Sequence, residues 1–140
     1  VARVGHPLFG ARKLTAKRFA SSAHVMASQW GAFTGPVDDS LAKAGLRRTV
    51  AVVVPGFPDA LRIAGATDLV SVVPRSMLGG PLPVDHETRA RVTAFALPVR
   101  VPEIRVSAMW HPRFDADPAH RWLRRTVTAR FNEVVPARGT

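Results

Sequence analysis

The chain has 140 residues, which is the size of one ordinary domain. Its 46% hydrophobic and 21% charged residues are typical of a globular protein and exclude a disordered or collagen-like chain. There is no cysteine, so disulfides, thiolate metal sites and a cysteine nucleophile are excluded.

The formal net charge of +10 is the main unusual feature of the composition. Of the 20 Lys and Arg residues, 17 are arginines, and they are scattered rather than gathered into a basic arm. This pattern favours a solvated cationic surface, with direct nucleic-acid contact as the alternative. No apolar run reaches the ~18–20 residues of a membrane span, so we expect no membrane partner and a cytoplasmic protein.

Strands alternate with helices along the chain. The predicted elements are, in order, a strand 1–4 stopped by Gly5 and Pro7, a helix after Thr15 with Phe19 facing the core, a strand 24–28, a helix from Pro36 to Ala44 before Gly45, a strand 49–54, a helix from Pro58 to Gly65, a strand 68–73, a short helical turn and loop 75–91, and strands 92–97 and 104–110. The β-branched run 49–54 is typical of a strand buried on both faces of a parallel sheet. The alternation predicts an α/β fold built on βαβ units.

The last predicted element is an amphipathic helix. Asp117 is its expected cap, and Pro118 takes the first helical position. Apolar residues then recur at helical spacing on one face: Ala119, Trp122, Leu123, Val127 and Phe131.

The residues that most often carry catalysis are present without the spacing that catalysis needs. No metal-binding pattern connects the histidines, which are His6, His24, His86, His111 and His120. No serine lies in a nucleophile elbow, and no phosphate-binding glycine loop follows a strand. The sequence therefore predicts no catalytic residue, no metal, no cofactor and no enzymatic activity. We expect His6 and His111, which both precede a proline, to lie in turns.

Two loops are candidates for ligand binding because each joins the carboxyl end of a predicted strand to a helix N-terminus, where free backbone N–H groups accept anions. The first contains Trp30 and Phe33 and leads to Thr34, while the second is 55–57. Their aromatic rings, N–H groups and hydroxyls suit a small aromatic or organic acid. In the alternative interpretation, Trp30 and Phe57 are core residues and the glycines only turn the chain.

Four segments carry a resemblance to a known family. The segment 110–124, WHPRFDADPAHRWLR, resembles the WHxRxDxDPxHxWLR ending of LysR-type transcriptional regulators, in the branch that controls nodulation and aromatic-compound degradation. Residues 5–8 resemble the family's GHPL, residues 38–48 resemble its DxxLxxxGxxR helix, and residues 68–74 resemble the stretch that ends in its proline. The resemblance covers residues 1 to about 131.

The resemblance implies a periplasmic-binding-protein-like lobe with a Rossmann-like βαβ sheet, plus a returning strand and C-terminal helix of the second lobe. In this division residues 1–6 are the crossover strand and hinge, 7–98 are lobe II, 99–131 return to lobe I, and 132–140 are a tail. It also implies a fragment without the winged helix-turn-helix and the first half of lobe I. DNA would then be contacted only through the absent N-terminal domain.

The resemblance further implies an effector-binding function without a cofactor. A small aromatic or carboxylic acid is the expected effector, bound between the lobes, and its binding modulates an oligomer on DNA. The implied ligand-binding residues are Pro55, Gly56, Phe57, Ser28, Trp30, Phe33 and Thr34, and the implied hinge residues are Val4, Gly5, Pro98 and Val99. We expect self-association through 99–131, because Trp110, Trp122 and Phe131 would otherwise be exposed. The alternative is a stand-alone solute-binding or interaction domain with no DNA-linked role.

Overall fold

A parallel pair of strands forms the centre of the fold. In the computed structural model, which describes residues 1–10, 13–79, 85–104 and 107–134, β2 (Ala23–Ala27) pairs in parallel with β3 (Thr49–Val54). His24 also forms a parallel bridge with Val70, on the side of β2 away from β3. β2 therefore lies in the middle of three parallel segments, which confirms the predicted βαβ arrangement.

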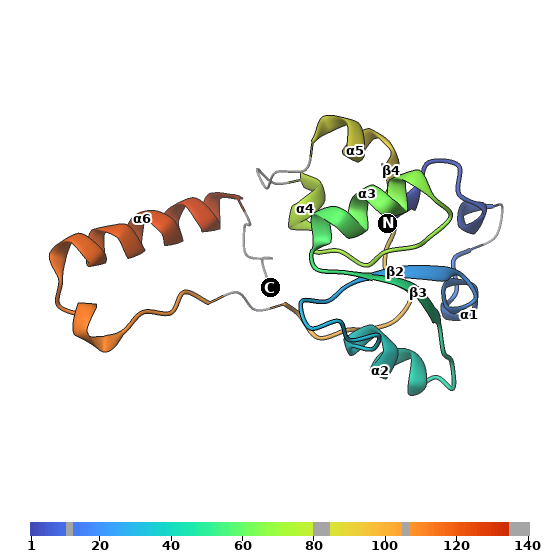
Figure 1. Ribbon diagram of the computed structural model, residues 1–140, viewed down its shortest axis with the longest axis horizontal. Helices are drawn as coiled ribbons and strands as arrows, with labels where there is room; N and C mark the ends of the chain where they lie inside the picture. The colour runs from blue at the N-terminus through green and yellow to red at the C-terminus, as the bar shows by residue number, and fades with distance from the viewer. Residues whose placement is uncertain (11–12, 80–84, 105–106, 135–140) are drawn as a thin grey trace.

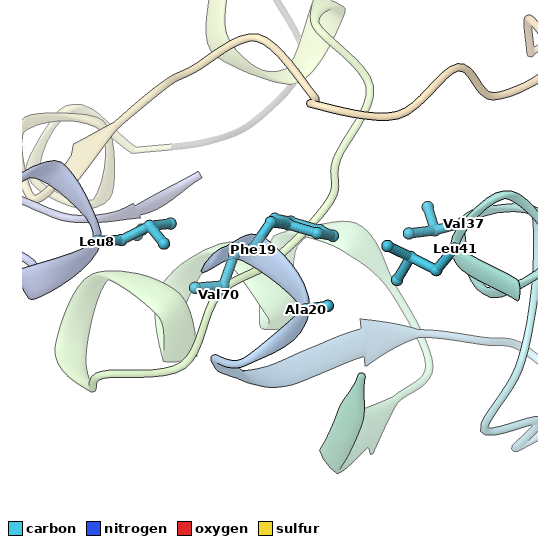
Figure 2. Packing of buried hydrophobic residues seen from close by; sticks show 7 residues of the cluster. Leu8, Phe19, Ala20, Val37, Leu41 and Val70 are labelled. Carbon is cyan, nitrogen blue, oxygen red and sulfur yellow. The ribbon is translucent and has the colours of Figure 1, made fainter. Parts of the chain in front are cut away.

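The crossover helices cover opposite faces of these strands (Figure 1). One apolar cluster contains Phe19 of α1 (Ala16–Ala20) and Leu41 of α2 (Pro36–Ala42), packed with Val70. The other contains Leu61 of α3 (Phe57–Ala66), packed with Val25. Figure 2 shows the Phe19 ring between Leu8 and the α2 residues Val37 and Leu41.

The helix termini follow the signals in the sequence. The Thr15 hydroxyl accepts a hydrogen bond from the Arg18 N–H and begins α1, as predicted. α2 begins at Pro36, and Gly45, with φ of +68°, lies just beyond its end. Two shorter helices complete this part: α4 (Ser76–Gly79), and α5 (His86–Ala90), which is capped by the Asp85 carboxylate.

A second, antiparallel pair joins the start of the chain to a distant segment. β1 (Ala2–Arg3) pairs with β4 (Val92–Thr93), with Ala2 opposite Thr93. Gly5, with φ of +71°, turns the chain after β1 into the 3-10 helix η1 (Pro7–Phe9). The His6 Nδ1 accepts a hydrogen bond from the Leu8 N–H, so the expected turn at His6 is confirmed.

Several predicted strands are shorter than expected or absent. In 68–73 only Val70 makes a bridge, and in 92–97 only Val92 and Thr93 are in a strand. No strand forms over 104–110 in the residues that are described, namely 104 and 107–110. The physical reason is that a strand requires a paired neighbour, and residues 107–110 run outside the body that holds the strands (Figure 1).

The prediction that 49–54 is buried on both faces is wrong. β3 pairs with β2 along one edge only, and Thr49 and Ala51 are exposed. β-branched residues favour a strand but do not tell a central strand from an edge strand.

The C-terminal helix lies apart from the body (Figure 1). The 3-10 helix η2 (Pro112–Phe114) precedes α6 (Pro118–Val134), and the His111 Nδ1 accepts a hydrogen bond from the Arg113 N–H. The predicted helix start and the predicted turn at His111 are therefore confirmed. The apolar face of α6, formed by Trp122, Leu123, Val127 and Phe131, is exposed rather than packed. Within the described ranges, no helix has both the length and the apolarity that crossing a membrane requires.

Candidate functional site

The two predicted ligand loops leave the same edge of the parallel strands. Ala27 at the end of β2 lies opposite Val54 at the end of β3, and the Ser28 N–H donates to the Val54 carbonyl oxygen at 2.8 Å. Loop 28–35 and turn 55–57 therefore start from neighbouring positions. Such a carboxyl edge is where open α/β sheets bind ligands.

Loop 28–35 presents its aromatic side chains to solvent. The Ser28 Oγ accepts a hydrogen bond from the Ala32 N–H at 2.9 Å, and Gly31 adopts φ of +70° at the tip. Trp30 is 91% exposed and Phe33 is 60% exposed, while Thr34 is also exposed. The interpretation of Trp30 as a core residue is therefore wrong. An exposed pair of aromatic rings is free to contact a ligand.

Turn 55–57 is less exposed than the loop. Pro55 is exposed, whereas Gly56 and Phe57 are half-buried, and Phe57 is the first residue of α3. In the described part of the chain, the N–H groups of Gly56 and Phe57 have no hydrogen-bond acceptor. They are the backbone donors that this turn offers to an anion. Asp59 in the first turn of α3 is already paired with Arg62.

The start of α2 does not offer the expected free donor. The Asp38 carboxylate accepts a hydrogen bond from the Gly35 N–H at 2.8 Å and thus occupies that donor. Asp38 is in turn held by Arg48, whose Nε and Nη2 donate to its two oxygens at 2.8 and 2.9 Å. Partial burial raises the pKa of Asp38, but the hydrogen bonds and positive charge of Arg48 outweigh that effect and lower the pKa overall.

This ion pair is a feature that the sequence analysis missed. Asp38 and Arg48 are the first and last residues of the DxxLxxxGxxR pattern, so the spacing was visible as a motif. Nothing in the sequence indicated that the two side chains meet, because the chain reverses between them at Gly45.

The four predicted hinge residues lie at two places in the body. Val4 and Gly5 follow β1, where the Val4 N–H donates to the Arg91 carbonyl oxygen at 2.9 Å. Pro98 and Val99 precede Arg100, whose carbonyl oxygen accepts a hydrogen bond from Ser40 of α2 at 2.6 Å. Val99 also packs against the cluster that contains Phe19.

One cavity is lined by residues outside the two loops. It has a volume of about 610 Å³ and includes none of the seven predicted ligand-binding residues. Its lining comes from Val1, 71–73, Arg75, Leu78 and 94–97. Segments 71–73 and 94–97 were both predicted to be strands, and a strand pattern does not indicate a cavity.

The C-terminal signature, residues 110–124, is held together by contacts among its own side chains and backbone. The Trp110 Nε1–H donates to Asp115 at 3.0 Å, and the Arg124 guanidinium lies 4.5 Å from the centre of a Trp110 ring. Arg124 also donates to the carbonyl oxygens of Phe114 and Asp115 at 2.9 and 3.1 Å. The Asp117 carboxylate caps α6 by accepting from the His120 N–H at 2.7 Å. These signature residues therefore fix the start of α6.

Across the described ranges, no three His, Asp or Glu side chains are grouped closely enough to hold a metal ion.

Comparison with known proteins identifies relatives over nearly the whole chain. The chain is 30% identical over 131 residues to the HTH-type transcriptional activator NahR of Pseudomonas putida, covering 94% of this chain and 42% of that protein. It is 30% identical over 120 residues to the HTH-type transcriptional activator NagR of Ralstonia, covering 86% of this chain and 38% of that protein. It is 35% identical over 132 residues to the HTH-type transcriptional regulator SyrM of Rhizobium meliloti, covering 92% and 38%. The chain thus spans roughly two fifths of the length of these relatives.

Solved structures show the same relationship. A probable transcriptional regulator from Pseudomonas aeruginosa superposes with a TM-score of 0.56 at 30% identity, covering 72% of this chain and 32% of that one. The regulatory domain of MexT, a transcriptional activator of the same organism, superposes with a TM-score of 0.52 at 25% identity. This match covers 84% of this chain and 56% of that one. The family described as LysR substrate binding domain matches residues 1–132. The chain therefore belongs to the LysR substrate-binding domain family, with the periplasmic-binding-protein-like fold of that family.

Proposed function

We propose that the chain senses a small aromatic or organic acid for a LysR-type transcriptional regulator, and that the ligand binds between loop 28–35 and turn 55–57. The observation that carries this proposal is the Ser28 to Val54 hydrogen bond, which brings both loops to one sheet edge. Trp30 and Phe33 supply aromatic surface, and the N–H groups of Gly56 and Phe57 supply donors for a carboxylate.

The wider arrangement belongs to the same proposal. Residues 1–6 form the crossover strand and hinge, 7–98 form one lobe, 99–131 belong to the other lobe, and 132–140 are a tail. The ligand lies in the cleft between the lobes, with Val4, Gly5, Pro98 and Val99 as the hinge. The separation of α6 from the body supports this division (Figure 1). The regulator acts without catalysis in the cytoplasm and contacts DNA through an N-terminal domain of the kind that the names of the HTH-type relatives indicate.

We expect Trp30→Ala to weaken binding of the probe salicylate about tenfold, because stacking on an exposed indole contributes roughly 1–1.5 kcal/mol. The measurement is isothermal titration calorimetry, supported by a thermal-shift series with benzoate, a flavonoid and succinate. His86→Ala, a change of an exposed ring outside both loops and outside residues 99–131, is the control. Equal binding by the Trp30 variant and the parent chain, or no binding of any of these compounds, would contradict the proposed site.

We also propose that the chain self-associates through residues 99–131. The support is the exposed apolar face of α6, together with exposed Ile104 and Met109 in the preceding segment. A contiguous apolar face of this kind is typical of an interaction surface rather than of a free monomer. A second copy offers the same face, so an isologous contact would cover both.

The chain is therefore expected to be larger than a monomer at micromolar concentration in light scattering, and Leu123→Lys is expected to lower its mass to that of the monomer. A buried lysine without a partner opposes association. Thr128→Lys adds the same charge to the opposite side of α6 and should leave the mass unchanged. A monomeric parent chain would refute the self-association.

A further inference from the structure

The motif that spans Asp38 to Arg48 has no role in the proposed function so far, yet its end residues form the most enclosed ion pair among the described side chains. Arg48 is 3% exposed and Asp38 is 19% exposed, whereas every other ion pair in the described ranges has at least one partner that is more than half exposed. The contact is bidentate, with both Asp38 oxygens accepting from Arg48. Such a pair is costly to desolvate, and its usual benefit is a defined position rather than stability.

The pair connects the sheet to the far end of the ligand loop. Arg48 directly precedes β3, and Asp38 lies in the first turn of α2. The Asp38 carboxylate that binds Arg48 also accepts the Gly35 N–H at 2.8 Å. Gly35 is close to Met26 of β2, because a Cβ at Gly35 would lie 3.1 Å from the Met26 Cε. The last residue of the loop is therefore linked through one carboxylate to Arg48 before β3, and it packs beside Met26 of β2.

The other end of the loop is held in a different way. Ser28 is bonded to β3 through its backbone N–H and to Ala32 through its hydroxyl. Between these two attachments Trp30 and Phe33 are largely exposed, so packing does little to fix them. The position of the loop thus depends on its two ends. Only the Gly35 end is held by an ion pair.

We propose that Asp38 and Arg48 are positioning residues for ligand recognition: the ion pair holds Gly35 and thereby sets where Trp30 and Phe33 stand beside turn 55–57. This inference rests on the proposed ligand site for its functional consequence, but the effect on the loop itself requires no ligand. Loosening the pair leaves the ligand-contacting residues in the chain and allows them more positions, which weakens binding.

The test is fluorine NMR of the chain labelled with 5-fluorotryptophan, which gives one signal each for Trp30, Trp110 and Trp122. Asp38→Asn and Arg48→Met are expected to shift or narrow the Trp30 signal and to leave the other two signals unchanged. Asp39→Asn removes a charge from the same turn, and Arg47→Met removes an exposed cation beside Arg48, so these matched controls should change none of the three signals.

Calorimetry with salicylate then reports the functional consequence. We expect the Kd to rise about tenfold in Asp38→Asn and Arg48→Met and to stay unchanged in the two controls. If Arg48→Met does not fold, Arg48→Lys keeps the charge, loses the two-pronged contact and should still alter the Trp30 signal. An unaltered Trp30 signal in folded variants would overturn the positioning role. An altered signal together with a parent chain that binds no acid would instead overturn the proposed ligand site.

Discussion

Phe19→Ala is expected to lower the free energy of unfolding by about 3–5 kcal/mol, which is the usual cost of emptying a fully buried aromatic site. Phe19 is completely buried at the centre of one apolar cluster (Figure 2). Its ring meets the His24 ring edge-on at 4.7 Å between centres and the Phe95 ring, also edge-on, at 6.3 Å. The substitution therefore removes contacts with α2, β2 and the segment after β4 together. A domain of this size has only about 5–15 kcal/mol of stability, so the loss is a large fraction of it.

Urea unfolding followed by circular dichroism measures this change. The matched control is Phe33→Ala, because Phe33 is largely exposed and its loss should change stability by no more than about 0.5 kcal/mol. If both variants unfold at the urea concentration of the parent chain, Phe19 does not have the central packing role that its burial implies.

Acidification is expected to destabilise the fold between pH 6.5 and pH 4, through His24. This side chain is fully buried, its Nε2 is 3.0 Å from the Phe19 carbonyl oxygen, and its Nδ1 has no partner in the described part of the chain. Burial, followed by the positive charge of Arg48, lowers the pKa of His24 from 6.5 to about 4. Asp38 and the Phe19 hydrogen bond act in the opposite direction and are outweighed.

The sign of the effect follows from proton binding. Between pH 6.5 and 4 the unfolded chain binds a proton at His24 that the folded chain does not, so the free energy of unfolding falls as the pH falls. The full difference is about 3 kcal/mol, at 1.36 kcal/mol for each unit of pKa shift.

Urea unfolding at a series of pH values tests this expectation. His24→Gln should flatten the dependence below pH 6.5, whereas His86→Gln, at an exposed position in α5, should leave it as in the parent chain. A parent chain as stable at pH 4.5 as at pH 7 would contradict the assignment to His24.

The helices of this fold could be predicted from the sequence because their signals are local. Thr15 caps α1, Pro36 and Gly45 bracket α2, and Asp117 with Pro118 begins α6. The extents of the strands beyond β3 could not be predicted, because pairing depends on residues far along the chain. The sequence 104–110 has the composition of a strand, but its described residues 107–110 lie outside the body and pair with no strand there.

Part of the candidate site could be predicted from the order of the elements along the chain. Loops at the carboxyl ends of β2 and β3 follow from the order of the elements, because parallel strands place those ends together. The Asp38 to Arg48 contact depends on how the chain reverses at Gly45, and spacing alone does not show it. The occupation of the Gly35 N–H by Asp38 likewise appeared only with the side chains in place.

The pairing of β1 with β4 affects the order in which parts of the chain fold during synthesis. Ala2 is synthesised before the parallel unit, whereas Thr93, its partner, is synthesised after it. The parallel strands with α2 and α3 can assemble while synthesis continues, but residues 2–3 lack their strand partner until 92–93 are available. Closing this long-range contact is an intrinsically slow step, so the final locking of the body comes late in folding.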